Sequence, residues 1–119
     1  MTAKLIKASL ACLVLIYQSG FASDLPLDPK LMMFAPYLGT WQSSFAMEGG
    51  KSSVTDVSKW ERALNGKAIR TLHSINDGDY GGESLIFFDK NKQQLVFYYF
   101  TTADFFTQGS IEPVDNNTF

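Results

Sequence analysis

The chain has 119 residues, with 12 acidic and 10 basic side chains, one histidine and one cysteine. A chain of this length holds one domain at most. The acidic excess and the lack of a basic cluster argue against nucleic-acid binding, which depends on cationic contacts to phosphate.

Residues 1–22 have the pattern of a signal peptide. Lys4 and Lys7 form a basic start, an apolar run covers residues 8–17, and the small Gly20 and Ala22 precede a cleavage point. The run is shorter than the about 18 residues that a membrane span needs. Cys12 lies in the middle of the run, whereas a lipoprotein would carry its cysteine at the end. We therefore expect Sec-type bacterial export, cleavage after Ala22, and a periplasmic or secreted product without a stable membrane anchor.

The mature segment, residues 23–119, is predicted to be a single β-rich domain without cysteine, so it has no disulfide and no thiolate chemistry. Removing two lysines leaves 8 basic against 12 acidic residues, a net charge of −4. His73 is the only imidazole, which excludes a histidine-based metal site. Asp77, Asp79 and Glu83 lie among glycines in a pattern typical of a turn, not of a calcium loop. No metal and no cofactor are expected.

The first predicted element is a short helix after Asp28. Asp28 is a favourable N-cap, and Pro29 suits the first helical position. Pro36 should end the helix. A helix this short must dock on an apolar surface to be stable.

From Gly39 the pattern indicates strands, at 39–47, 54–64 and 67–75. Asn65-Gly66 between two such runs predicts a type I′ hairpin turn, because both positions need positive φ. Counting outward from that turn pairs Glu61 with Arg70 and Ser58 with His73. One face then carries Lys59, Glu61 and Arg70 and should be solvated. The other face is apolar with polar groups set into it, and it comprises Ser58, Trp60, Arg62, Leu64, Ile69, Thr71, His73 and Ile75.

A loop at 76–82 is followed by a second hairpin, with strands at 83–88 and 94–101, and by a sixth strand at 104–111. The fold class is therefore all-β, an antiparallel meander of about six strands with a short N-terminal helix, which would form part or all of a barrel. Closed up-and-down barrels usually have about eight or more strands. We expect either a domain truncated at its C-terminal side or closure by self-association through an open sheet edge.

Gly39-Thr40-Trp41, just after the short helix, resembles the Gly-x-Trp opening of the calycin group, which includes lipocalins, fatty-acid-binding proteins and nitrobindin-like barrels. Residues 60–67, 73–78 and 98–103 are similar to bacterial secreted proteins with lipocalin-like domains. The resemblance covers residues 29–111 and implies a lipocalin-like domain with a calycin-like barrel and a ligand in its lumen, but no particular reaction. Nitrobindin-like relatives hold haem with a histidine near the C-terminal end. This chain has none after His73, so haem binding is not implied.

The candidate site residues are polar or aromatic side chains on the apolar face of the hairpin predicted at 54–64 and 67–75, the face that comprises Ser58, Trp60, Arg62, Leu64, Ile69, Thr71, His73 and Ile75. Arg62, with His73, is expected to hold the acidic head of an apolar ligand, because a guanidinium facing inward needs a negative partner. An outward-turned Arg62 is the alternative. The other ligand-binding candidates are Ser58, Trp60 and Thr71. Structural roles are assigned to Gly39, to Trp41 as a plug at the barrel base, and to Asn65 and Gly66.

Three functions are compatible with these residues. The first is a non-enzymatic module that binds a small apolar or amphipathic ligand. The second is a small-molecule enzyme with His73 as base, although no Ser-His-Asp triad is evident, since Asp56 is only a diagonal neighbour of His73. The third is an interaction or assembly module that uses exposed aromatic strands. No catalytic residue is assigned.

Overall fold

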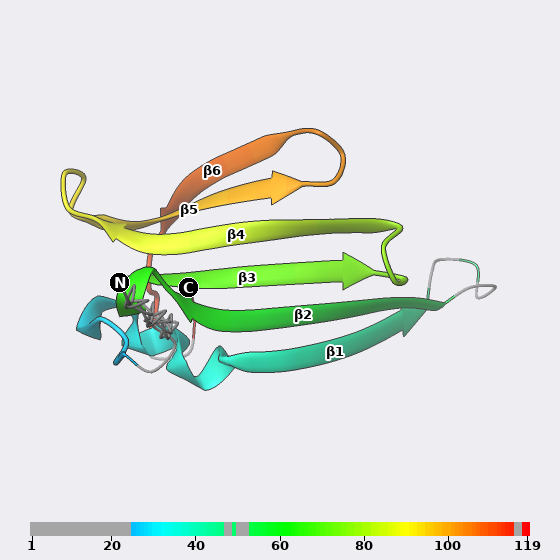
Figure 1. The fold of residues 1–119 in the computed structure, drawn as a ribbon, viewed down its shortest axis with the longest axis horizontal. Helices are drawn as coiled ribbons and strands as arrows, with labels where there is room; N and C mark the ends of the chain where they lie inside the picture. The colour runs from blue at the N-terminus through cyan, green and yellow to red at the C-terminus, as the bar shows by residue number, and fades with distance from the viewer. Residues whose placement is uncertain (1–24, 47–48, 50–52, 116–117) are drawn as a thin grey trace, which may run out of the picture.

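The computed structural model describes residues 25–46, 49, 53–115 and 118–119, so the predicted signal peptide lies outside the described residues. Six antiparallel strands form one sheet in chain order, which confirms the predicted all-β meander (Figure 1). They are β1 (Gly39–Ala46), β2 (Ser53–Ala63), β3 (Ala68–Ile75), β4 (Tyr80–Asp89), β5 (Gln94–Thr101) and β6 (Phe106–Ile111). The sheet is open, with β1 and β6 at its edges. No helix in the described ranges is long and apolar enough to cross a membrane.

The β2–β3 hairpin has the register that the Asn65-Gly66 turn predicts. Glu61 pairs with Arg70, and Ser58 pairs with His73. Asn65 and Gly66 have φ of 55° and 82°, the positive values that a type I′ turn needs. The Lys67 N–H closes the turn by donating to the Leu64 carbonyl at 2.9 Å. These four residues contain the short 3-10 segment η3 (Leu64–Gly66).

Several predicted boundaries were wrong, among them those of β2 (Ser53–Ala63, predicted at 54–64) and β3 (Ala68–Ile75, predicted at 67–75). The loop predicted at 76–82 is shorter, because β4 already begins at Tyr80. The last strand begins at Phe106, not at residue 104, because Asp104 has a positive φ of 62° and the Thr101 N–H bonds to the Phe105 carbonyl instead. Pro36 lies inside the 3-10 helix η2 (Pro29–Tyr37), which ends one residue later than predicted.

The core lies where η2 covers one end of the sheet. The Asp28 side chain caps η2 by accepting from the Lys30 N–H at 2.9 Å, as predicted. Helix residues Leu31 and Phe34 are fully buried. They meet sheet residues that share one face through the strand register: Trp60, Ile69, Ile86, Leu95 and Phe97. We call this the helix-side face and the opposite one the far face.

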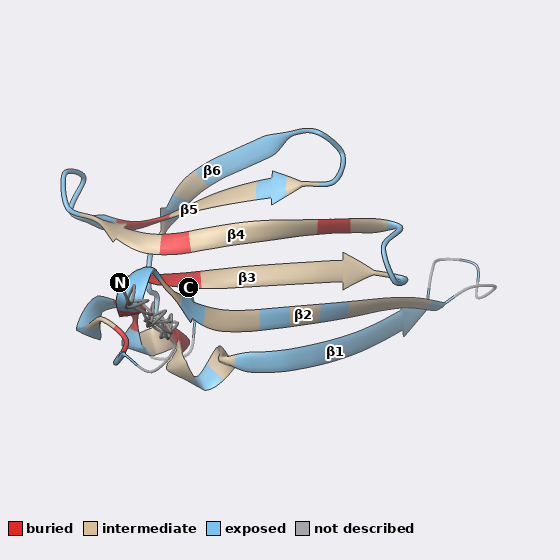
Figure 2. Cartoon of the chain, viewed as in Figure 1, coloured by how far each residue is buried: buried red, intermediate tan, exposed pale blue. Residues whose placement is uncertain are grey.

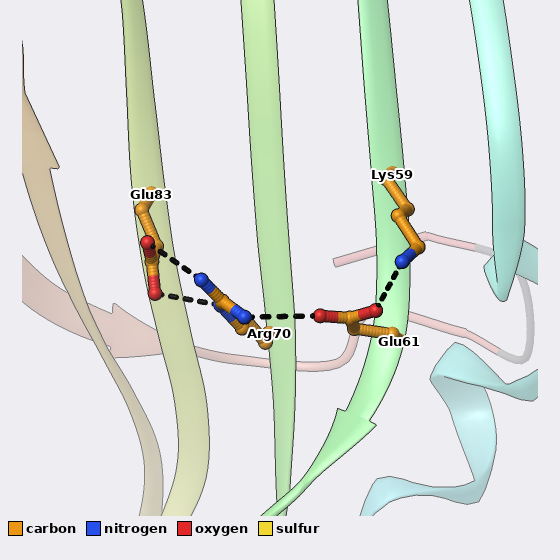
Figure 3. Close-up of polar contacts among 4 residues, drawn as sticks. All are labelled: Lys59, Glu61, Arg70 and Glu83. Atoms are coloured by element: carbon orange, nitrogen blue, oxygen red, sulfur yellow. Dashed lines mark hydrogen bonds and ion pairs between the residues drawn. The ribbon is translucent and has the colours of Figure 1, made fainter. Parts of the chain in front are cut away.

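The far face carries an ion-pair network across three strands (Figure 3). Arg70 donates from Nε and Nη2 to the two carboxylate oxygens of Glu83, at 2.7 and 3.0 Å. Its Nη1 lies 3.2 Å from Glu61, and Lys59 lies 2.6 Å from the other oxygen of Glu61. The Lys59 hydrogen bond is the main reason that the pKa of Glu61 falls below 4.5. The predicted Glu61–Arg70 pair is therefore confirmed.

Burial decreases away from η2 (Figure 2). Every residue of β1 is exposed, and β6 is mostly exposed. Trp41 was expected to plug the barrel base, but its side chain is 50% exposed. Its indole N–H donates to the Tyr37 carbonyl at 2.6 Å, which fixes it beside η2 without covering it. The reason is the open sheet, because β1 is an edge strand and no described segment packs over this end of it.

Gly66→Ala should strongly destabilise the fold. A Cβ at this position would lie 2.1 Å from the Pro26 carbonyl oxygen, and φ is +82°. Backbone strain and the clash together should lower the free energy of unfolding by about 2 kcal/mol or more. Gly78→Ala is the control, because its φ is +120° but nothing lies within 4 Å of the new Cβ. Urea denaturation of both variants checks this, and equal losses would contradict it.

The stability contributed by Glu61 should depend on pH. Its pKa is lower in the folded than in the unfolded chain, so its contribution is present above about pH 4.5 and is lost as the pH falls further. Glu61→Gln should lower the free energy of unfolding by about 1 kcal/mol or less at pH 7. The difference from the unmodified chain should vanish near pH 3. Glu112→Gln, an exposed change outside the strands, should show no such pH-dependent difference in the same denaturation series.

Candidate functional site

A connected row of polar side chains lies on the helix-side face, beyond the part covered by η2. His73 of β3 is at its centre, with Nδ1 3.3 Å from Oδ1 of Asp56 on β2. Its Nε2 lies 2.7 Å from the Tyr99 hydroxyl on β5. The Tyr99 hydroxyl lies 3.3 Å from that of Tyr80 on β4. We call these four residues the polar chain.

A glycine makes room for the centre of the polar chain. Gly82 pairs with His73, and a Cβ there would lie 2.3 Å from the Tyr99 ring. The Tyr99 ring therefore lies over the bare backbone of β4 and reaches His73 on the strand beyond. Tyr80 packs edge-on against His73, with ring centroids 5.9 Å apart. Aromatic rings thus hold the imidazole on two sides.

Tyr99 stays protonated at neutral pH. Burial, together with the hydrogen bond to Tyr80 and the negative charge of Asp56, raises the pKa of Tyr99 to about 12. The phenol can therefore donate and accept hydrogen bonds, but it does not supply a phenolate base. His73 is partly buried, with 23% of its side chain exposed, so the polar chain borders solvent.

Hydroxyl groups surround the polar chain on the same face. Ser58 pairs with His73, Thr71 pairs with Trp60, and Ser84 pairs with Tyr99. All three are partly exposed. The structure places Ser58, Thr71 and His73 together, as the sequence predicted, and adds Ser84.

Two other predicted site residues lie apart from this group. Trp60 packs against η2, with its ring centroid 6.3 Å from Phe34 and 5.9 Å from Tyr37. Arg62 is exposed and pairs with Ile69, four positions along β2 from Ser58, which is about 13 Å at the rise of a strand. Arg62 is therefore turned to solvent, the alternative stated above, and lies outside the polar chain.

The far face has a hollow of about 510 Å³ behind the polar chain. Gly81 forms part of its floor, and Leu72, Val57 and Phe100 supply apolar walls, with Lys59 and Glu83 of the ion-pair network at its border. Phe100 is 54% exposed and stacks on Phe106. This hollow is open and mostly apolar, and among the described residues it lacks the group of converging polar side chains that orients a ligand in a typical binding site. Among the described residues, no group of three or more His, Cys, Asp or Glu side chains could hold a metal ion.

Sequence reasoning missed three members of the polar chain. Asp56 was discounted as a diagonal neighbour, yet a diagonal on the same face is within reach of an imidazole. Tyr80 and Tyr99 were not among the predicted site residues. The Gly81-Gly82 pair opposite His73 was the available signal, because a glycine within a strand often marks a close approach of another group.

Gly82→Ala should separate Tyr99 from His73, because the new methyl group occupies the space of the Tyr99 ring. The ¹⁵N chemical shifts of the single histidine should move, which heteronuclear NMR detects without ambiguity. Gly109→Ala is the matched control, because its Cβ would meet the Phe97 ring at 2.8 Å on the same face, away from His73. Both changes should reduce stability. Unchanged histidine shifts in Gly82→Ala alone would show that the predicted displacement is wrong.

No family model matches the chain, and neither a curated protein nor a solved structure shows significant similarity to it.

Proposed function

We propose that this protein is a non-enzymatic binding module for a small amphipathic ligand, held on the helix-side face. The observation that carries the proposal is the polar chain itself, four hydrogen-bonded side chains from four strands, on the same face as the apolar core beneath η2. Binding sites for small molecules are mostly apolar with a few converging polar groups. The apolar part of the ligand would contact Trp41, Phe45 and Ile75, which share this face by register.

Binding is favoured over catalysis by the state of the polar chain. Both ring nitrogens of His73 are already occupied, one by Asp56 and one by Tyr99. A substrate proton would have to displace Tyr99 before His73 could act as a base. The raised pKa of Tyr99 also makes that residue a poor base or nucleophile. The polar chain is therefore better suited to binding a polar group of a ligand than to abstracting a proton from a substrate.

The place of action that fits this proposal is the periplasm or the exterior of the cell. The basic start, apolar run and small residues of segment 1–22 are its support. A calycin-like role, in which the helix-side face would line a ligand cavity, agrees with export and with the Gly-x-Trp motif at residues 39–41.

Self-association is a second candidate function, and one observation favours it. Phe100 and Phe106 stack on each other on the far face while both are more than half exposed. Exposed aromatic groups of this kind are common at protein–protein contacts. A native mass spectrum with a dimer that Phe106→Ser removes would support this role, and a monomer at all concentrations would exclude it.

Binding should be measurable with the apolar dye N-phenyl-1-naphthylamine, whose fluorescence increases in an apolar site. Tyr99→Phe removes one hydroxyl from the polar chain and should change the dye affinity or stoichiometry. Tyr98→Phe is the matched control, because the adjacent residue lies on the far face, where its ring stacks on Phe87. Tyr98→Phe should bind as the unmodified chain does. No dye binding by the unmodified chain, or equal effects of the two variants, would contradict the proposal.

A further inference from the structure

The number of protons on each group of the polar chain determines which atom donates and which accepts in each of its hydrogen bonds. A neutral imidazole has one N–H donor and one acceptor nitrogen, and each phenol has a single proton to donate. The Asp56 carboxylate, 3.3 Å from Nδ1, can only accept. Neutral His73 must therefore carry its proton on Nδ1, which leaves Nε2 as an acceptor.

The remaining directions follow from that tautomer. With Nε2 as acceptor, the Tyr99 hydroxyl 2.7 Å away must donate to it. Tyr99 has then used its only proton, so its oxygen must accept from the Tyr80 hydroxyl at 3.3 Å. The only proton of the Tyr80 hydroxyl is then donated to Tyr99 within the polar chain. Tyr80 therefore offers only oxygen lone pairs to anything bound beside it.

Protonation of His73 reverses its hydrogen bond to Tyr99, and the Tyr99 proton then has the Tyr80 oxygen as its acceptor within the polar chain. Both imidazole nitrogens become donors, so Nε2–H now donates to the Tyr99 oxygen. Tyr99 keeps its proton throughout the neutral range, and that proton turns toward the Tyr80 oxygen. The Tyr80 proton is released from the chain and points outward. No bond is broken in this reversal other than hydrogen bonds.

We propose that protonation of His73 switches Tyr80 from a hydrogen-bond acceptor to a donor, so that the site prefers ligands with an acidic or carbonyl head group when His73 is protonated. The ligand preference rests on the proposed binding function, whereas the reversal itself does not. Histidine is the side chain that ordinarily changes charge between pH 5 and 8.

Among the described residues, few charged groups other than Asp56 face His73, so few other charges act on its protonation. Asp56 from β2 is the charged group in contact with the imidazole, and Tyr80 and Tyr99 contribute phenols from β4 and β5. The positions on β1 that face this part of β2 are Trp41 and Ser43, which carry no charge. Lys59, Glu61 and Glu83 belong to the far face, where they pair with one another and with Arg70.

The direction of the hydrogen bonds around neutral His73 is tested without any ligand. The full sequence contains one histidine, so long-range ¹H–¹⁵N spectra of the labelled protein report on His73 alone. At high pH the Nδ1–H tautomer should dominate in the unmodified chain. Asp56→Asn should shift the balance toward Nε2–H, while Asp115→Asn, far along the chain, should leave it unchanged. A dominant Nε2–H tautomer in the unmodified chain would overturn the proposed direction.

The ligand preference is tested with two naphthalene dyes, 1-anilinonaphthalene-8-sulfonate and its uncharged analogue N-phenyl-1-naphthylamine. The sulfonate dye should bind about fivefold more tightly at pH 5.5 than at pH 7.5, the effect of about one added hydrogen bond. The uncharged dye should show no such change. Tyr80→Phe should abolish the pH effect on the sulfonate dye, whereas Tyr98→Phe, on the far face, should retain both that effect and the binding of the uncharged dye.

These experiments distinguish a failure of the proposed switch from a failure of the proposed binding function. A pH effect that persists in Tyr80→Phe would come from the histidine charge alone and would overturn the switch. If neither dye binds at either pH, the binding function fails, and with it the ligand preference. The histidine spectra still decide in that case whether neutral His73 has the proposed tautomer.

Discussion

The strand register set at the Asn65-Gly66 turn is the constraint on which the rest of this structure depends. Side chains alternate between faces along a strand, so a shift of one residue would exchange the two faces of a strand. With the observed register, Ile69 lies under η2 while Arg70 lies on the far face with Glu61 and Glu83. The same turn also anchors the N-terminal segment. The Asp28 N–H donates to the Gly66 carbonyl at 2.9 Å, and Lys67 forms an ion pair with the Asp28 carboxylate.

The two faces of the sheet are stabilised by different interactions. Near η2 the helix-side face is dry, and burying apolar side chains there supplies most of the favourable free energy of folding. Further from η2 the same face becomes polar, and the hydrogen bonds among Asp56, His73 and Tyr99 satisfy groups that are partly removed from water. On the far face, the contacts of Arg70 connect β2, β3 and β4 through charge. These contacts are half exposed and contribute less to stability than the core does.

The open sheet is the least usual feature of the described fold. Natural edge strands commonly carry lysine, proline or a bulge that prevents pairing with other chains. Neither β1 nor β6 contains a charged residue or a proline. Exposed Trp41 and Phe45 on β1 and exposed Phe106 on β6 place apolar groups at both edges. Both edges are thus suited to further β-pairing.

Local chemistry in the sequence determined much of the fold. Asp28 and Pro29 specified the start of η2, and Asn65-Gly66 specified a turn from which the pairing of Glu61 with Arg70 and of Ser58 with His73 followed by counting. These features depend on residues close in sequence, so short-range rules predict them. The loop before β6 was misplaced because the positive φ of Asp104 has no strong sequence signal.

Only the tertiary structure decided the composition of the candidate site. His73 and Tyr99 lie on β3 and β5, with β4 between them, and they meet because Gly82 leaves space for a ring to cross that strand. Whether a polar side chain meets a partner across two strands depends on side-chain direction and on the volume of the residue between them. The exposure of Trp41 and of Arg62 depends on which segments cover the sheet. Sequence patterns fix which residues share a face, but long-range packing fixes which of them touch.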